Sequence, residues 1–369
     1  QILESDSLNF TANFGKANAL SSLKRYDDAL IFINKTLSLD PNNTSAKTSK
    51  RYILYGVADT KRKQLDYKAA IAILDKVLEE HRNDEQALIN KGICYLSMKD
   101  IRTAEWIFNY MQDRDINKFE SALLLSHINL IKHNNKNALS FSEQGISLSD
   151  TDAKLLRASV QKVNVLGASK DFKSAHKLID ELEADFGKNQ ELILARGRMH
   201  IWDQDYKKGL ENYNAIDDSS YVLHMGLAEA YRAKKQNLDA MAEIKRALVR
   251  IPNQPDALGL LHDLDLEQSP KFEVSTFTSS DIGKNLADNL FAKFSMPIKQ
   301  RHRLILDAGI RETRQELTGV NAQQISFLLG DHWQINHRFS LKASGGLIQY
   351  TQDDQANGTG TPSCRWQIK

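Results

Sequence analysis

The chain has 369 residues, of which 41% are hydrophobic, so it is long enough to build two or three domains with substantial cores. Lysine and arginine total 49 against 47 acidic residues, and this near balance argues against nucleic acid as a partner. No apolar run approaches the roughly 18 residues that a transmembrane helix requires. Any contact with a membrane must therefore be made by strands or by a surface.

The sequence carries no recognisable catalytic or metal-binding motif. Its two cysteines, Cys94 and Cys364, are too few for a disulfide framework or a zinc cluster, and Cys94 is expected to be a buried, inert thiol. The ten histidines lack metal-ligand spacing, and neither a nucleophile elbow nor a phosphate-binding glycine loop is present. We therefore expect a protein without enzymatic activity, metal or cofactor. An enzyme with an unrecognised fold is a further hypothesis, which the loss of an activity on replacing a single His or Asp would support.

The chain starts at Gln1 without a signal-peptide pattern, so we expect a processed product or a piece of something longer.

The first part of the chain carries a sequence pattern that repeats about every 34 residues. Small residues recur in a similar setting, with successive spacings of 41, 34, 34, 37, 34 and 31. The unit around Ala138 departs from the pattern, because Ser142 and Gly145 stand where other units have large or small apolar residues. A small residue lets two helices approach closely, so the pattern predicts seven stacked helical pairs. The aligned small residues are Ala29, Ala70, Ala104, Ala138, Ala175, Gly209 and Ala240.

A second set of small residues marks the first helix of most units, and Pro41 and Pro252 stand where second helices would end. With these features the chain resembles the tetratricopeptide repeat over about residues 8–268, and we assign residues 1–268 to a repeat solenoid. The resemblance implies an extended concave surface that binds peptides, polymers or other subunits. The first-helix residues are Ala17, Ala58, Gly92, Gly197 and Ala228.

In the repeat frame, the concave face near the end of the array is predicted to carry a mixed polar and aromatic set. Such a set is able to stack on and hydrogen-bond a sugar or a peptide. The alternative is that these are ordinary solvated surface residues together with a packed indole. The predicted ligand-binding residues are Arg198, Trp202, Glu229 and Arg232.

From residue 269 onward the pattern alternates with period two, which predicts an antiparallel all-β region over 269–369. One face of each strand is apolar and the other is polar, as when a strand separates lipid from a watery lumen. A soluble sheet with one face on a core would alternate identically. Trp333 and Tyr350 lie near strand ends, where aromatic residues of a membrane interface belong. The predicted pore-facing residues are Glu273, Lys293, Arg303, Asp307, Arg311 and Lys342.

The order of repeats followed by alternating strands resembles the outer-membrane exopolysaccharide export porins, of the poly-N-acetylglucosamine porin and cellulose synthase operon C type. The resemblance implies a periplasmic repeat array that binds polymer or partner proteins, and a β-barrel that contacts outer-membrane lipid and passes a polysaccharide. Five or six strands are too few for a barrel, which needs at least about eight, so the barrel is expected to be incomplete. The alternative is a soluble, cytoplasmic tetratricopeptide scaffold for protein partners with a small β accessory domain.

Overall fold

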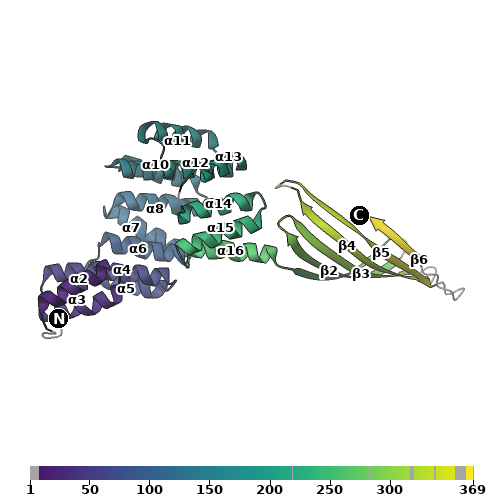
Figure 1. Ribbon diagram of the computed structural model, residues 1–369, viewed down its shortest axis with the longest axis horizontal. Coiled ribbons are helices and arrows are strands. Elements are labelled where there is room, and N and C mark those ends of the chain that lie inside the picture. The colour runs from purple at the N-terminus through teal and green to yellow at the C-terminus, as the bar shows by residue number, and fades with distance from the viewer. Residues whose placement is uncertain are drawn as a thin grey trace. The chain divides into compact units, whose positions relative to one another are not determined.

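Helices give way to strands at a single point in the chain (Figure 1). The computed structural model describes residues 8–217, 219–281, 285–315, 320–335, 338–353 and 363–368, with backbone only for 352–353 and 363–368. The last helix ends at Gln268 and the first strand begins at Lys271. This confirms the predicted solenoid followed by an antiparallel sheet. The residues group into two compact units, 1–217 with 251–255 and 218–250 with 256–369, so three helices belong with the sheet.

The first unit is a stack of helical pairs in which each helix packs on the next along the chain. Within each pair the helices are joined by a tight turn, and the pairs follow one another in chain order. The pairs are α2 (Phe10–Ser22) with α3 (Tyr26–Leu39), α4 (Thr44–Lys63) with α5 (Tyr67–Glu80), α6 (Glu85–Ser97) with α7 (Ile101–Asp113), α8 (Lys118–Ile131) with α9 (Asn135–Ser147), α10 (Asp152–Ala168) with α11 (Phe172–Phe186), and α12 (Gln190–Trp202) with α13 (Tyr206–Asn214).

The boundaries of these helices follow from local chemistry. Most begin after an Asn, Asp, Ser or Thr whose side chain accepts a hydrogen bond from a backbone N–H three residues later, as Asn43 does from Ala46 at 3.0 Å. Each pair is joined by a turn with one residue in the left-handed region. These residues have the same successive spacings as the predicted small residues, so the repeat around Ala138 is present as well. The left-handed residues are Lys24, Leu65, Lys99, His133, Lys170, Gln204 and Lys235.

The small residues serve the close approach that the sequence predicts. Ala29, Ala70 and Ala104 are fully buried. Gly92 of α6 lies against the ring of Phe108 in α7, where a β-carbon added at Gly92 would come within 2.3 Å of the ring. The core of this pair is therefore filled by a large side chain packed on a small residue.

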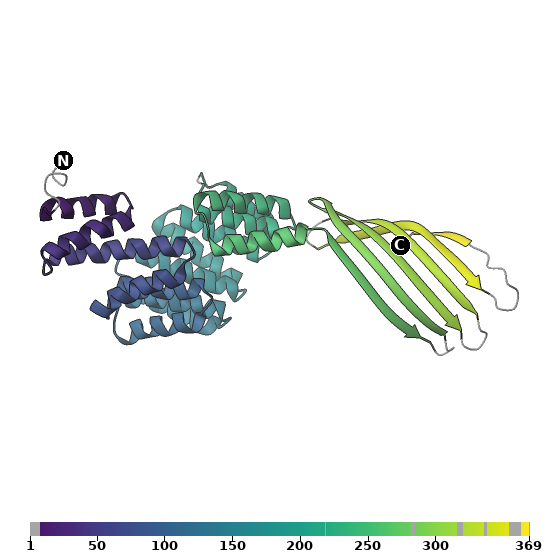
Figure 2. The same cartoon turned by 90° about the horizontal axis from the view of Figure 1, so that it is seen from below.

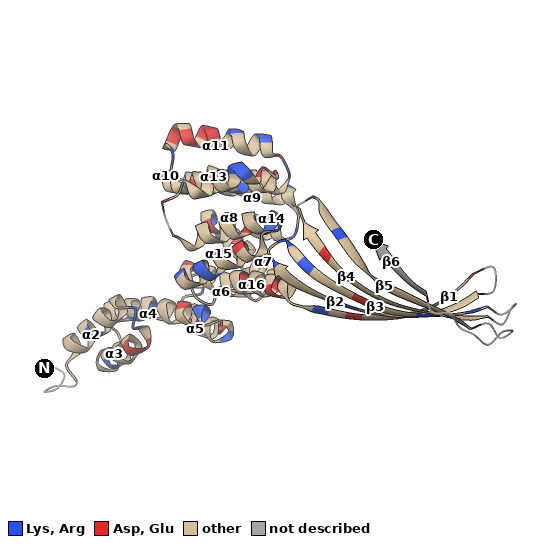
Figure 3. Cartoon of the chain, turned by 45° about the vertical axis from the view of Figure 1, so that its right-hand side comes forward, with Lys and Arg blue, Asp and Glu red and all other residues tan. Residues whose placement is uncertain are grey.

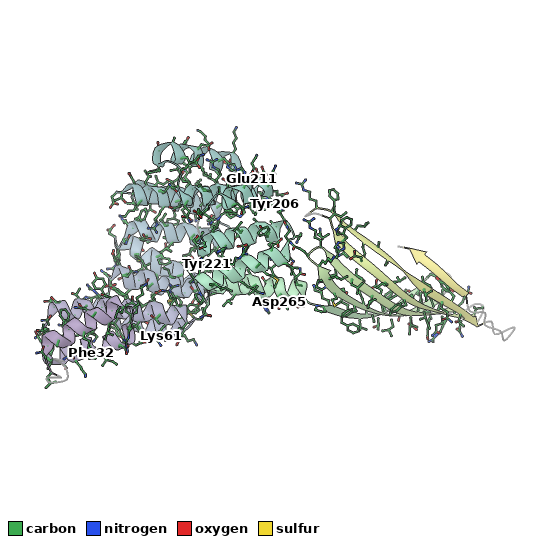
Figure 4. The ribbon with its side chains drawn as sticks, in the orientation of Figure 1. Phe32, Lys61, Tyr206, Glu211, Tyr221 and Asp265 are labelled. Carbon is green, nitrogen blue, oxygen red and sulfur yellow. The ribbon has the colours of Figure 1, made fainter. Side chains whose placement is uncertain are left out.

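The second unit contains α14 (Tyr221–Ala233), α15 (Asn237–Arg250), α16 (Pro255–Gln268) and the sheet. The hydroxyl of Tyr221, labelled in Figure 4, donates to Asp256 Oδ1 at 2.7 Å and ties α14 to α16. Each strand pairs antiparallel with its neighbour in chain order, and Figure 2 shows the strands side by side. The strands are β1 (Lys271–Ser280), β2 (Asn285–Lys299), β3 (His302–Gln315), β4 (Asn321–Gln334), β5 (Ser340–Asp353) and β6 (Ser363–Ile368).

The two faces of this sheet differ in composition and exposure. The apolar face carries exposed side chains such as Phe327 and Leu329, which are 54% and 52% accessible. The polar face is the more shielded one, since Asn289 and Ser295 on it are buried, together with Ile305 and Ile348. A soluble sheet buries its apolar face instead, so this arrangement is the reverse of the usual one.

Candidate functional site

All six predicted pore-facing residues share the polar face of the sheet, as the strand register shows. Glu273, Lys293 and Asp307 stand directly opposite one another on β1, β2 and β3. Lys342 Nζ of β5 lies 3.9 Å from Asp307 Oδ2. Figure 3 shows charges of both signs along these strands. The alternation makes a ladder of opposite charges that is close to neutral and favours no single charge in a ligand.

A cavity of about 450 Å³ opens on this ladder. One oxygen of Asp307, Oδ1, is buried and has no hydrogen-bond partner among the described residues. A buried carboxylate oxygen without a partner is costly, and a hydroxyl donor entering the cavity would satisfy it. The polar and aromatic residues that line the cavity are Glu273, Ser275, Phe291, Lys293, Asp307, Ser326, Lys342 and Ser344.

Two aromatic rings on the polar face were not foreseen from the sequence. Phe277 and Phe291 stack with centroids 5.9 Å apart and an interplanar angle of 21°. Gly309 makes room for this pair, because a β-carbon there would meet Phe291 at 2.6 Å. The sequence did contain a signal for them, because each phenylalanine occupies a position at which the alternating pattern has polar residues. Together with the serine hydroxyls, the rings form a surface that suits the apolar face and hydroxyls of a sugar.

The two predicted arginines on this face have different surroundings. Arg303 points at the junction between helices and strands, donating to the main-chain oxygen of Glu267 at 2.6 Å and to Ser295 Oγ at 3.1 Å. Arg311 is exposed and stands opposite Asn289. Arg303 is therefore engaged in holding α16 on the sheet, whereas Arg311 is available to a ligand.

The four predicted residues of the repeat array fall into two pairs, which belong to different compact units. Arg198 of α12 donates to Asn164 Oδ1 of α10 at 2.9 Å. Trp202 is 39% exposed and its indole packs on Gly167. The second pair, Glu229 and Arg232, is exposed on α14. Each pair shares one side of its own helix, and the residues remain candidates for binding.

A further set of polar contacts links the first helices α8 and α10. Arg157 of α10 forms a bidentate ion pair with Glu120 of α8, at 2.7 and 3.1 Å. Gln161 Nε2 donates to Ser126 Oγ at 3.1 Å. Glu120, Arg157 and Gln161 border a cavity of about 280 Å³ that also contacts His127. The array thus offers a polar groove along its first helices.

The described part of the chain contains no group of three or more His, Cys, Asp or Glu residues suited to hold a metal ion. None of its helices combines the length and the apolar character needed to cross a membrane. Cys94 is buried as predicted, and burial raises the pKa of its thiol to about 11. A thiol with that pKa is protonated at neutral pH and is a poor nucleophile.

Comparison with known proteins identifies the repeat. Residues 10–43 match the family model described as tetratricopeptide repeat. The chain is similar in fold to a tetratricopeptide repeat protein from Parabacteroides merdae, with a TM-score of 0.55 and 12% identity, covering 69% of this chain and 98% of that one. A weaker likeness, with a TM-score of 0.41 and 14% identity, links it to pilF of Pseudomonas aeruginosa, over 56% of this chain and 89% of that one. No curated protein matches the chain.

Proposed function

We propose that this protein is a non-enzymatic component of exopolysaccharide export in the outer membrane of a Gram-negative bacterium. In this proposal the sheet forms part of the wall of a membrane pore. The repeat array lies in the periplasm and binds the polymer or partner proteins. A closed wall needs at least about eight strands, so strands beyond the sheet described above would complete it.

The observation that carries the proposal is an exposed apolar band across the sheet. On the apolar face, four consecutive rows of residues paired across the strands are mainly apolar. One of these rows consists of Val274, Ala292, Ala308, Phe327 and Leu347. Rows are two residues apart, so four rows span about 20 Å along the strands, comparable with the apolar band of a membrane barrel.

Both ends of the band are polar or interfacial. At one end a row of polar residues crosses five strands, namely Thr278, Asp288, Glu312, Gln323 and Thr351. At the other end His302 stacks on Trp333 with ring centroids 5.7 Å apart. Trp333 is 41% exposed, which suits an aromatic residue at a membrane interface.

The connections between strands agree with this orientation. Two turns lie at the end of the sheet that joins α16, residues 300–301 and residues 335–339, and the longest connection lies at the opposite end. Connections at the opposite end span residues 281–284, 316–320 and 354–362, as strand bounds define them. Outer-membrane barrels have short turns on the periplasmic side and longer loops outside, so the repeats would lie in the periplasm.

The polar face supplies the chemistry of passage. Hydroxyl groups, charges of both signs and the Phe277–Phe291 stack can replace water around a sugar through many weak contacts. Weak contacts are needed because a tightly held polymer would not move. No bond is made or broken in this work, so catalytic residues are not required.

A flotation experiment tests the membrane part of the proposal. The full chain, refolded with dilauroyl phosphatidylcholine vesicles, should float with the lipid in a density gradient. Phe327→Asp with Leu329→Asp should abolish flotation, because charges on the lipid-facing side of a membrane barrel are destabilising, most of all near the bilayer midplane. The matched control, Ser326→Asp with Ser344→Asp, adds the same charge to the polar face and should still float. A chain that stays monodisperse and lipid-free without detergent would favour the soluble scaffold instead.

Titration with soluble oligosaccharides tests the cargo. Cellopentaose and pentameric N-acetylglucosamine should bind weakly by calorimetry, and Phe291→Ala should reduce the affinity. Phe272→Ala, which removes an exposed ring from the apolar face, is the control and should leave binding unchanged. If neither sugar binds, or if both variants behave alike, the polar face of the sheet does not recognise glycans.

A further inference from the structure

Helix α4 is longer than the first helices of most repeats. It has 20 residues, whereas α2 and α6 have 13 each. The N-cap Asn43 precedes the left-handed Leu65 by 22 residues, while Asp84 precedes Lys99 by 15. The difference of seven residues equals the excess of the 41-residue spacing over 34. The irregular spacing therefore reflects two extra turns at the start of α4.

The extension leaves a groove beside it. Helix α5 runs back along α4 but has only 14 residues, so it does not cover the first two turns of α4. The C-terminal half of α3 forms the other wall. The result is a groove of about 610 Å³ in the first unit, and its apolar lining consists of Leu30, Leu37, Pro41, Leu54 and Val77.

The walls of this groove carry an excess of positive charge. Lys47, Lys50 and Arg51 recur at helical spacing and so lie on one side of α4, and Lys76 is contributed by α5. These four cations face two acids, Glu79 and Glu80. The remaining polar lining residues are Asn34 and His81.

The cations have little competition within the chain. Arg51 lies 3.7 Å from Asp84, which also accepts a hydrogen bond from Tyr55 at 2.6 Å. Lys47, Lys50 and Lys76 take part in no ion pair among the residues that the structure describes. Their ammonium groups are therefore free to meet carboxylates from outside.

We propose that this groove binds an acidic peptide segment of a partner protein, with an apolar side chain seated between α3 and α5. The seven extra residues of α4 extend about 10 Å, which equals about three residues of an extended peptide. The excess of positive charge favours an acidic partner, and the leucines that line the groove favour a partner that also carries an apolar residue. The site lies wholly in the first unit, so it does not depend on the sheet or on export.

Fluorescence anisotropy on the full chain tests the proposal. The probe is a fluorescein-labelled heptapeptide in which glutamate alternates with leucine. Lys47→Glu with Lys50→Glu should weaken its binding by about tenfold or more, since two attractive charges become repulsive. The matched control, Lys136→Glu with Lys173→Glu, makes the same change of charge at exposed positions of α9 and α11 and should bind the probe normally.

Two further peptides separate the sources of affinity. Replacing glutamate by glutamine, or leucine by serine, should each reduce binding, and added salt should weaken the parent peptide. Equal losses in the groove variant and the control variant would overturn the proposal, because binding would then be nonspecific attraction. So would unchanged binding by the groove variant. Self-association of the chain that disappears in the groove variant would assign the groove to a second copy instead of a partner.

Discussion

Substitution at the contact between Gly92 and Phe108 tests how the repeats are packed. Phe108 is fully buried, so Phe108→Ala should cost about 3–5 kcal/mol of unfolding free energy. A methyl group at Gly92 would come within 2.3 Å of the ring, so Gly92→Ala alone should cost about 1–3 kcal/mol. Once the ring is removed, the clash is gone and the better helix propensity of alanine remains. Gly92→Ala should then stabilise the Phe108→Ala chain by up to about 1 kcal/mol.

Urea unfolding followed by circular dichroism at 222 nm measures this reversal of sign. The control is Gly15→Ala in α2, where an added β-carbon meets nothing within 4 Å. That change should stabilise the chain by about 0.5–1 kcal/mol through helix propensity alone. If Gly92→Ala costs the same with and without the Phe108 ring, the two residues are not coupled and the packing argument fails.

Three other predictions concern the cap, the thiol and the junction. Hydrogen bonds from the hydroxyl and, second, from the backbone N–H of Thr103 lower the pKa of Asp100 below its ordinary value of 3.8. The stabilisation by this N-cap is therefore fully present above pH 3.8 and is lost as the pH falls through the lower pKa of the folded state. Asp100→Asn should flatten the fall of the thermal midpoint in that acidic range, and an unchanged fall would exclude the cap as its source. Cys94, in a Cys364→Ser chain, should react with Ellman's reagent only on unfolding, whereas rapid native labelling would show that it is accessible. Arg303→Gln should speed thermolysin cleavage at the helix-to-strand junction, since it removes contacts to the main chain there, and Arg311→Gln should not.

The period of the hydrophobic pattern predicted the larger features of this fold. Small residues at a spacing near 34 marked the helical pairs, because close helix contact allows little else there. The change after Pro270 marked the strands, and the alternation correctly grouped Glu273, Lys293 and the other charged residues on one face. The atypical fourth repeat forms as well. The hydroxyl of its buried Ser142 donates a hydrogen bond to the carbonyl oxygen of Leu139 at 2.7 Å, so burial leaves this hydroxyl paired.

What the sequence did not predict depends on contacts between distant residues. Arg303 binds the carbonyl of Glu267, which lies 36 residues earlier, and no periodic pattern reports such a contact. Phe277 and Phe291 meet only through strand register, which requires the turn length as well as the alternation. The irregular spacing of 41 residues indicated an insertion in the sequence, but only the helix lengths show that the extra residues belong to α4.

The two extra turns of α4 also explain why the array tolerates an irregular repeat. An α-helix advances about 100° per residue, so seven residues rotate the chain by about 700°, only about 20° short of two full revolutions. The side chains beyond the insertion keep nearly the same azimuth, and Ala58 still faces its partner helix. An insertion of five residues would instead rotate the rest of the helix by about 140°, and the side chains that pack against the partner helix would then face solvent. A whole number of turns is thus the natural unit in which such an array can gain a new surface without losing its interior.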